Sequence, residues 1–291
     1  MFYGSIPALV SPFRDDALDE DAFGALVRWQ IACGSHGLAP AGTTGEAPAL
    51  SAAEHRRVIE ICVAEANGKI PVIAGCGANI TTKACVLAET AKAAGADAVL
   101  VAAPYYNKPS QEGIYAHYAA LAQIGIPVIL YNIPGRSVID ISVDTMARLA
   151  KLEMIAGLKD ATADLGRVAD QRAQCGANFV QLSGDDLSAL GFAAHGGAGC
   201  ISVTANVAPA LCAQMQDALA RGDFTVACAL NDALQPLHRA LFADASPAPA
   251  KYALSLLGRC TPDLRLPLTP ANDSARKAVE NALSGLDLWS R

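Results

Sequence analysis

The chain has 291 residues, of which 52% are hydrophobic and 17% are charged, and its formal net charge is -6 at pH 7. This apolar content is sufficient to bury a sizeable core, so the chain is expected to be globular. The charged residues form no basic run, and this argues against binding to the phosphate backbone of nucleic acids.

The cysteines, histidines and N-terminus narrow the class of protein further. The nine cysteines lie in apolar segments without a C-x-x-C pair, which is typical of small core residues in a reducing cytosol. The five histidines form no cluster with the spacing of metal ligands. No signal peptide precedes the first apolar run, and no run reaches the length of a membrane span. We therefore expect a cytoplasmic protein that binds neither a metal nor a membrane.

Short apolar runs typical of buried strands alternate with periodic helical segments along most of the chain. The first strand is expected at 4–13, and acidic residues open the helix expected at 19–33. The other strands are expected at 37–41, 70–75, 98–103, 128–131, 155–159, 179–183 and 199–203. Further helices are expected at 52–66, 81–94, 111–123, 142–151, 164–174 and 186–195.

Eight strands, each followed by a helix, predict an α/β protein with a closed parallel (β/α)8 barrel, the TIM barrel. After about residue 220 the strand signal stops, and helical patterns continue at 223–241, 249–258 and 272–286. The sequence therefore predicts a catalytic barrel domain at 1–222 and a C-terminal helical domain at 223–291.

Lys159 ends one of the apolar runs and is the first candidate functional residue. The carboxyl ends of all barrel strands meet at one mouth, so polar residues that end apolar runs are gathered there. A lysine at this place can extend its amine to solvent. Alternatively, desolvation keeps part of the amine neutral and nucleophilic toward a carbonyl, as Schiff-base chemistry requires. Lys159 alone leaves both interpretations open.

Hydroxyl groups and cations follow several other strands. The loop Gly42–Glu46 holds two threonines and is either a tight turn or a site for a small carboxylate. The segments Pro104–Pro109 and Tyr131–Ser137 supply three tyrosines, a lysine and Arg136. Hydrogen-bonded tyrosine hydroxyls can pass the protons that imine formation moves. Arg136 could hold a substrate carboxylate with two parallel hydrogen bonds, or it could form a surface ion pair.

The last two strands end in segments rich in glycine and serine, at 183–186 and 196–206. Barrels often bind phosphate at this place, which makes a phosphate site the rival functional hypothesis. Neither segment contains lysine or arginine, so a phosphate would depend on backbone N–H groups alone. Packing of helix against strand is the simpler explanation of these glycines.

Six segments resemble, in order and spacing, the pyruvate-dependent class I aldolases and lyases related to dihydrodipicolinate synthase and N-acetylneuraminate lyase. They are GTTGE at 42–46, PYYNKP at 104–109, YNIPGR at 131–136, GLKDAT at 157–162, SGDD at 183–186 and GCISVTAN at 199–206. The resemblance covers the chain from end to end. Arg136 and the double threonine favour the synthase branch, because sialic acid and keto-deoxy sugar acid lyases usually lack that arginine.

The resemblance implies that this chain is a lyase-class enzyme of lysine and diaminopimelate biosynthesis. Lys159 would form a Schiff base with pyruvate beside Tyr131, and Thr43 and Tyr106 would complete a proton relay. The family commonly forms homotetramers built from tight dimers, so Tyr106 is expected to act in the site of a neighbouring subunit.

Four further residues would bind the substrates by the same resemblance. Thr44, the backbone of Ile201 and Gly184 would hold or line the site of pyruvate, and Arg136 would bind the carboxylate of L-aspartate 4-semialdehyde. No metal or organic cofactor is implied. Two alternatives stay open: a related lyase that uses another aldehyde, and a barrel retained as a non-catalytic binding protein.

The family's site for feedback inhibition by lysine is only partly matched. His55, Asn79 and Tyr105 agree with it. The serine, histidine and glutamate of sensitive relatives are replaced here by Ala47, Ala52 and Lys83. An added positive charge should repel the ammonium group of lysine, so we expect weak or absent inhibition.

Overall fold

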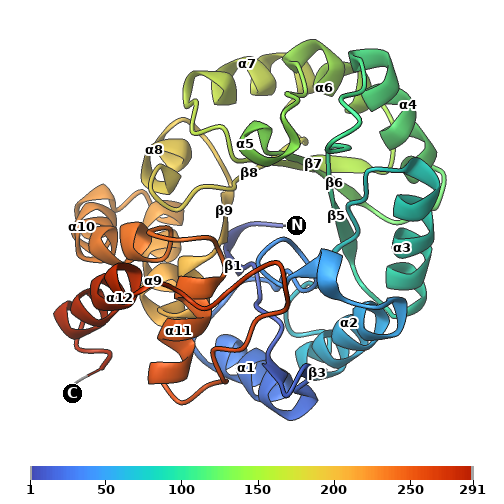
Figure 1. Cartoon of the computed structure of the whole chain (residues 1–291). Coiled ribbons are helices and arrows are strands. Elements are labelled where there is room, and N and C mark those ends of the chain that lie inside the picture. Colours follow the sequence, from blue (N-terminus) through green and yellow to red (C-terminus); the bar gives the residue numbers. More distant parts are fainter. Residues whose placement is uncertain (1, 290–291) are drawn as a thin grey trace.

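The computed structural model describes residues 2–289, and its centre is a curved sheet of parallel strands that helices surround (Figure 1). The strand order is β1-β9-β8-β7-β6-β5-β4. These strands are β1 (Gly4–Pro7), β4 (Ile73–Gly75), β5 (Ala98–Ala102), β6 (Val128–Asn132), β7 (Ile155–Asp160), β8 (Val180–Ser183) and β9 (Gly199–Ser202).

The segment expected as the second strand closes the sheet into a barrel. Leu38 bridges Val72 beside β4, and Ala39 bridges Ala8 beside β1. The backbone N–H of Ala39 donates to the carbonyl of Pro7 at 2.9 Å. This strand is short because prolines on it and on its neighbours lack the N–H that a longer ladder needs. The predicted (β/α)8 barrel is therefore confirmed.

Helices follow the strands and form the outer ring (Figure 1). They are α1 (Glu20–Ala32), α2 (Ala52–Ala66), α3 (Thr81–Ala93), α4 (Gln111–Ala122), α5 (Pro134–Ser137), α6 (Val143–Leu149), α7 (Gly166–Cys175), α8 (Ala189–Ala194) and α9 (Pro209–Ala220). Short 3-10 helices occur at Ala47–Ala49 (η1) and Thr204–Asn206 (η2). The single-turn helix α5 lies in the segment that follows β6, where no helix was predicted.

The first predicted strand was too long. β1 ends at Pro7, and the chain then forms a separate antiparallel hairpin of β2 (Phe13–Arg14) and β3 (Ala17–Leu18). The turn between these strands places two aspartates at positive φ. Aspartate adopts this conformation more readily than most residues, so the reversal ends the apolar run.

Alternation along each strand divides the apolar residues into two layers. On β6, Ile129 and Tyr131 face the barrel interior and pack with Leu182 and Ile201, while Leu130 belongs to the layer between barrel and helices. A side-chain period of two produces this division. The inward face of β6 therefore places Tyr131, near the carboxyl end of the strand, at the mouth.

Three helices complete the chain beside α8 and α9 (Figure 1): α10 (Phe224–Ala240), α11 (Ala248–Leu256) and α12 (Asp273–Gly285). Cys228 is exposed on α10, so the expectation that the cysteines are core residues is wrong for it. The proposed domain boundary between residues 222 and 223 falls in the turn before α10, and the division itself stays a prediction. Within residues 2–289, none of the helices has the length and apolar character needed to cross a bilayer.

A buried ion pair connects the C-terminal helices to the mouth of the barrel. Lys251 on α11 is 0% exposed and pairs with the carboxylate of Glu46, which is 2% exposed. The Lys251 amine also donates to the carbonyl of Asp263 at 2.8 Å and lies 4.2 Å from the centre of the Phe13 ring. Glu46 is the last residue of the GTTGE loop, so this pair attaches the loop to α11.

The segment between α11 and α12 adds a second connection. The backbone N–H of Arg265 donates to Glu46 Oε2 at 3.1 Å, and its guanidinium binds both carboxylate oxygens of Glu54 on α2. These hydrogen bonds lower the pKa of Glu54 to about 2. Figure 1 shows this orange-red segment reaching from α11 toward α2. The C-terminal helices are thus attached to the loop that carries Thr43 and Thr44.

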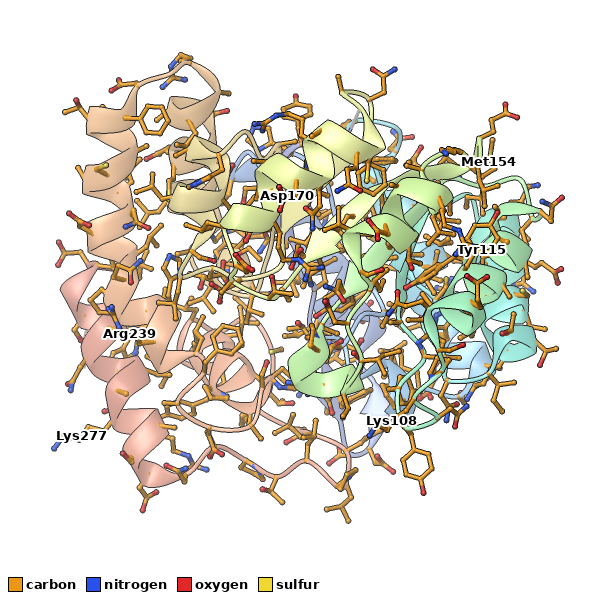
Figure 2. All side chains as sticks on the ribbon, turned by 90° about the horizontal axis from the view of Figure 1, so that it is seen from above. Lys108, Tyr115, Met154, Asp170, Arg239 and Lys277 are labelled. Atoms are coloured by element: carbon orange, nitrogen blue, oxygen red, sulfur yellow. The ribbon has the colours of Figure 1, made fainter. Side chains whose placement is uncertain are left out.

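We expect Lys251→Met to lower the free energy of unfolding by about 3–5 kcal/mol, because it leaves the Glu46 carboxylate buried without a counter-charge. The double variant Glu46→Gln/Lys251→Met should recover most of this loss, since glutamine removes the charge and keeps an acceptor for Arg265. Urea unfolding measures both changes. Lys277→Met, at an exposed lysine of α12 (Figure 2), serves as the control and should be neutral. A double variant no more stable than the single one would contradict this account.

Candidate active site

A cavity of about 250 Å³ opens at the carboxyl ends of the strands. Figure 2 shows that Lys108, which follows β5, lies on the mouth side, whereas Met154, which precedes β7, lies on the opposite face. Polar groups from several strand ends converge on the cavity. Its polar lining residues are Thr43, Thr44, Tyr105, Tyr131, Arg136, Ser137 and Lys159. The structure therefore brings most of the sequence-predicted site residues into one place.

Lys159 and Tyr131 are direct neighbours across two strands. β6 and β7 pair in parallel with Tyr131 opposite Lys159, and each residue is 6% exposed. The Lys159 Nζ lies 4.2 Å from the centre of the Tyr131 ring. No carboxylate of residues 2–289 lies within ion-pair distance of this amine. The amine therefore faces the cavity with an aromatic ring, and not a counter-ion, beside it.

Lys251 shows what a structural buried lysine looks like in the same molecule. Its amine has the Glu46 carboxylate and the Asp263 carbonyl as partners, as buried charges normally require. Lys159 has neither kind of partner. The interpretation of Lys159 as a lysine that extends to solvent is wrong, because its side chain is buried at the base of the cavity.

The GTTGE loop places two threonine hydroxyls at the cavity. Thr44 is 5% exposed and Thr43 is exposed, and both line the cavity. Gly45 permits the close turn, since a Cβ there would lie 2.9 Å from the carbonyl oxygen of Leu9. Ser11 donates to the carbonyl of Gly45 at 2.8 Å, and Glu46 adopts a φ of 53°. The loop is therefore held in one conformation from two sides.

Arg136 lies on α5, across the mouth from the two threonines. Its side chain is exposed and lines the cavity. The guanidinium can donate two parallel hydrogen bonds to a carboxylate. No ion pair or hydrogen bond within residues 2–289 engages it, so the alternative of a surface ion pair has no support within this chain.

Three expected residues do not line the cavity. Tyr106 is 86% exposed with a φ of 68° and lies outside it. Gly184 packs against the stem of Lys159, because a Cβ on it would lie 2.9 Å from Lys159 Cε. Ile201 is 1% exposed, and its side chain fills the barrel interior. Gly184 thus leaves room for the lysine, and the Tyr106 side chain forms no hydrogen bond with the part of its own chain that the structure describes.

The three residues expected from a lysine-binding site have separate surroundings. His55 lies within 2.7 Å of the carbonyl of Gly75 through Nε2, and burial lowers the pKa of this histidine. The carbonyl of Asn79 accepts a hydrogen bond from the side chain of Asn107 at 2.7 Å. Tyr105 lines the main cavity.

Sequence reasoning missed a set of buried polar residues behind the site. Asn132 and Asp160 follow Tyr131 and Lys159 on their strands, and both are buried. Asp160 lies one residue beyond the strand expected at 155–159, yet it is the last residue of β7. Both belong to a network with Arg167 on α7. Their position directly after each inward-facing residue was the available signal, but the pattern did not identify their partners.

The chemical groups around the cavity suit a small keto acid. A buried amine without a counter-ion can attack a carbonyl carbon, and a tyrosine and a threonine at the same mouth can move protons to and from its oxygen. An arginine on the rim can bind a carboxylate. These groups leave little room for a large substrate in about 250 Å³.

Comparisons with known proteins agree with this chemistry. The profile of the Dihydrodipicolinate synthetase family matches residues 1–286. The 4-hydroxy-tetrahydrodipicolinate synthases of Methylobacterium radiotolerans and Parvibaculum lavamentivorans are 59% and 57% identical, over 96% and 99% of this chain and 94% and 99% of theirs. The crystal structure of the chloride-inhibited dihydrodipicolinate synthase of Acinetobacter baumannii complexed with pyruvate has a TM-score of 0.96 at 42% identity, covering 99% of this chain and 100% of that one. The chain belongs to the dihydrodipicolinate synthetase family.

Proposed function

We propose that the chain is a 4-hydroxy-tetrahydrodipicolinate synthase, which condenses pyruvate with L-aspartate 4-semialdehyde in lysine and diaminopimelate biosynthesis. The observation that carries this proposal is the buried Lys159 amine, which faces the cavity beside Tyr131 without a carboxylate partner. Arg136 on the rim supports an aldehyde that bears a carboxylate. Its presence argues against a sialic acid or sugar acid lyase.

The reaction begins at the Lys159 amine. Nζ attacks the ketone carbon of pyruvate, and the resulting carbinolamine loses its oxygen as water. Tyr131 and Thr43 relay the protons that leave nitrogen and reach this oxygen. Thr44 and the backbone of Ile201 hold the pyruvate carboxylate, and Gly184 leaves room for the Lys159 side chain that carries the imine. The protonated imine then withdraws electrons from the pyruvate methyl group.

Carbon–carbon bond formation follows at that methyl carbon. Loss of a methyl proton gives an enamine, whose carbon attacks the aldehyde carbon while Arg136 binds the carboxylate of the same substrate. The substrate's own amine then attacks the imine carbon and closes the ring. The bond from this carbon to Lys159 Nζ breaks, and the free lysine is restored. We place this activity in the cytoplasm.

The first test is covalent capture of pyruvate. Incubation with pyruvate followed by borohydride should convert Lys159 to its N-(1-carboxyethyl) derivative, which adds the mass of pyruvic acid less one oxygen atom to the peptide that contains it. Lys251 is the internal control, because its amine is paired and outside the cavity. Mass spectrometry of the digested protein reads both sites. An unmodified Lys159 in a protein that keeps full activity would refute the mechanism.

Tyr106 supports a homotetramer built from tight dimers. Tyr106 is 86% exposed in a left-handed conformation, and its side chain makes no hydrogen bond or ring contact within residues 2–289. We propose that it enters the site of a neighbouring subunit and completes the relay of Tyr131 and Thr43 there.

Mixed dimers test this arrangement. Tyr106→Phe and Lys159→Ala subunits should each have little activity alone. Co-assembly should restore one complete site per mixed dimer, because the intact Lys159 of one subunit would meet the intact Tyr106 of the other. Steady-state assays before and after subunit exchange measure the recovery. No recovery in verified mixed dimers would show that Tyr106 does not act across an interface.

Inhibition by lysine is expected to be weak or absent. His55 is committed to the carbonyl of Gly75, and the exposed Lys83 brings a positive charge where sensitive relatives tend to have glutamate. A steady-state titration with L-lysine should therefore leave activity nearly unchanged, and Lys83→Glu should increase sensitivity. Strong inhibition of the unmodified protein at low lysine concentration would contradict this expectation.

A further inference from the structure

The strands that carry Lys159 and Tyr131 also carry a second, outward-facing pair. Asn132 lies opposite Asp160 in the register that pairs Tyr131 with Lys159. Because side chains alternate along a strand, this second pair points away from the cavity and toward the helix layer. Asn132 is 0% exposed and Asp160 is 3% exposed. Buried polar groups of this kind need partners.

Asn132 fastens the loop that carries Arg136. Its side-chain Nδ2 donates to Asp140 Oδ1 at 2.7 Å, and its Oδ1 accepts from the backbone N–H of Ile141 at 3.0 Å. One amide side chain thus brings the far end of the loop, at residues 140–141, back to the end of β6. The loop between them includes α5.

Arg167 on α7 connects this loop to β7. Its Nη1 donates to Asp140 Oδ2 at 2.8 Å, and its Nη2 donates to the carbonyl of Ile141 at 2.8 Å. Its Nε forms an ion-pair contact of 3.5 Å with Asp160 Oδ2, without a hydrogen bond, and the same oxygen accepts a hydrogen bond from Gln171 at 2.9 Å. The guanidinium therefore joins the Arg136 loop to the residue that follows Lys159.

The loop needs this support because its backbone is strained. Val138, directly after α5, has a φ of 65°, and a β-branched residue rarely adopts this left-handed conformation. Its side chain is 66% exposed and gains little from packing. Such strain persists only where the surroundings hold the chain in place. Within the loop, Ser137 Oγ lies 2.9 Å from the carbonyl oxygens of Ile133 and Ile139.

We infer that Arg167 is a positioning residue for the second substrate: through Asp140 and Ile141 it fixes the loop that presents Arg136 to the aldehyde's carboxylate. This inference rests on the proposed function. Two parallel hydrogen bonds to a carboxylate demand a defined guanidinium position, and a misplacement of about 1 Å can cost up to 100-fold in rate. Arg167 itself does not line the cavity.

The pyruvate half of the site has support of its own. β7 pairs in parallel with β6 on one side and β8 on the other, so Lys159 is held by sheet hydrogen bonds that do not involve Arg167. Thr43 and Thr44 come from a loop that Glu46 and Lys251 hold. Loss of Arg167 should therefore weaken the binding of aspartate semialdehyde and leave the binding of pyruvate unchanged.

The test uses Arg167→Met, which keeps an unbranched apolar side chain, and Asp140→Ala, which cuts the same connection at a residue whose side chain is 44% exposed. We expect both to raise KM for aspartate semialdehyde roughly tenfold at saturating pyruvate. KM for pyruvate and the yield of the borohydride adduct on Lys159 should stay near those of the unmodified protein. Arg167→Lys should be intermediate, since lysine keeps the charge but not the forked contacts.

Arg148→Met is the matched control. Arg148 lies on the neighbouring α6 and pairs with the exposed Glu112. The variant loses the same charge as Arg167→Met, and its KM values for both substrates should be unchanged. If Arg167→Met and Asp140→Ala leave the KM for aspartate semialdehyde unchanged, the inference is wrong. It is also wrong if both variants lose adduct yield on Lys159 to the same extent as they lose affinity for the aldehyde. Unmodified protein that forms the adduct without consuming aspartate semialdehyde overturns the proposed function, and the inference with it.

Discussion

The parallel pairing of β6 with β7 is the constraint on which the site depends. This register places the Tyr131 ring against the Lys159 amine inside the barrel, and it places Asn132 beside Asp160 on the other face. A slip by one residue would turn all four side chains to the wrong side, because alternation along a strand is strict. The contact between Lys159 and Tyr131 and the polar network behind it are therefore two results of one set of hydrogen bonds.

The two buried lysines differ in the groups that surround their amines. Lys251 has a carboxylate, a carbonyl and an aromatic ring around its amine, and it joins distant parts of the chain. Lys159 has an aromatic ring and an open cavity. Burial is nearly the same at both, so burial alone cannot identify a nucleophile. The missing counter-ion and the neighbouring hydroxyl make the difference.

Much of the barrel could be predicted from the sequence because buried parallel strands are short apolar runs and the helices between them are periodic. Strand ends then indicated Lys159, Tyr131, Thr43, Thr44 and Arg136, which all reach one cavity. The hairpin after β1 was missed because its strands have two residues each, too few for a period.

Partners that are distant in sequence could not be predicted. Glu46 meets Lys251 across about two hundred positions, and Arg167 on α7 meets Asp140 in the loop after α5. Alternation shows which face a residue occupies, but it does not show which residue lies opposite. The surroundings of Tyr106 are a similar case, because a single chain leaves it exposed.

The buried ion pair between Glu46 and Lys251 joins two segments that are synthesised at different times. All eight strands precede α11 in the chain, and N-terminal parts fold first during synthesis, so a barrel can begin to assemble while Glu46 still lacks its counter-charge. Only when Lys251 and the Arg265 segment arrive does the GTTGE loop gain its buried partners. The loop that carries Thr43 and Thr44 therefore has its full set of buried partners only when the C-terminal segment is in place.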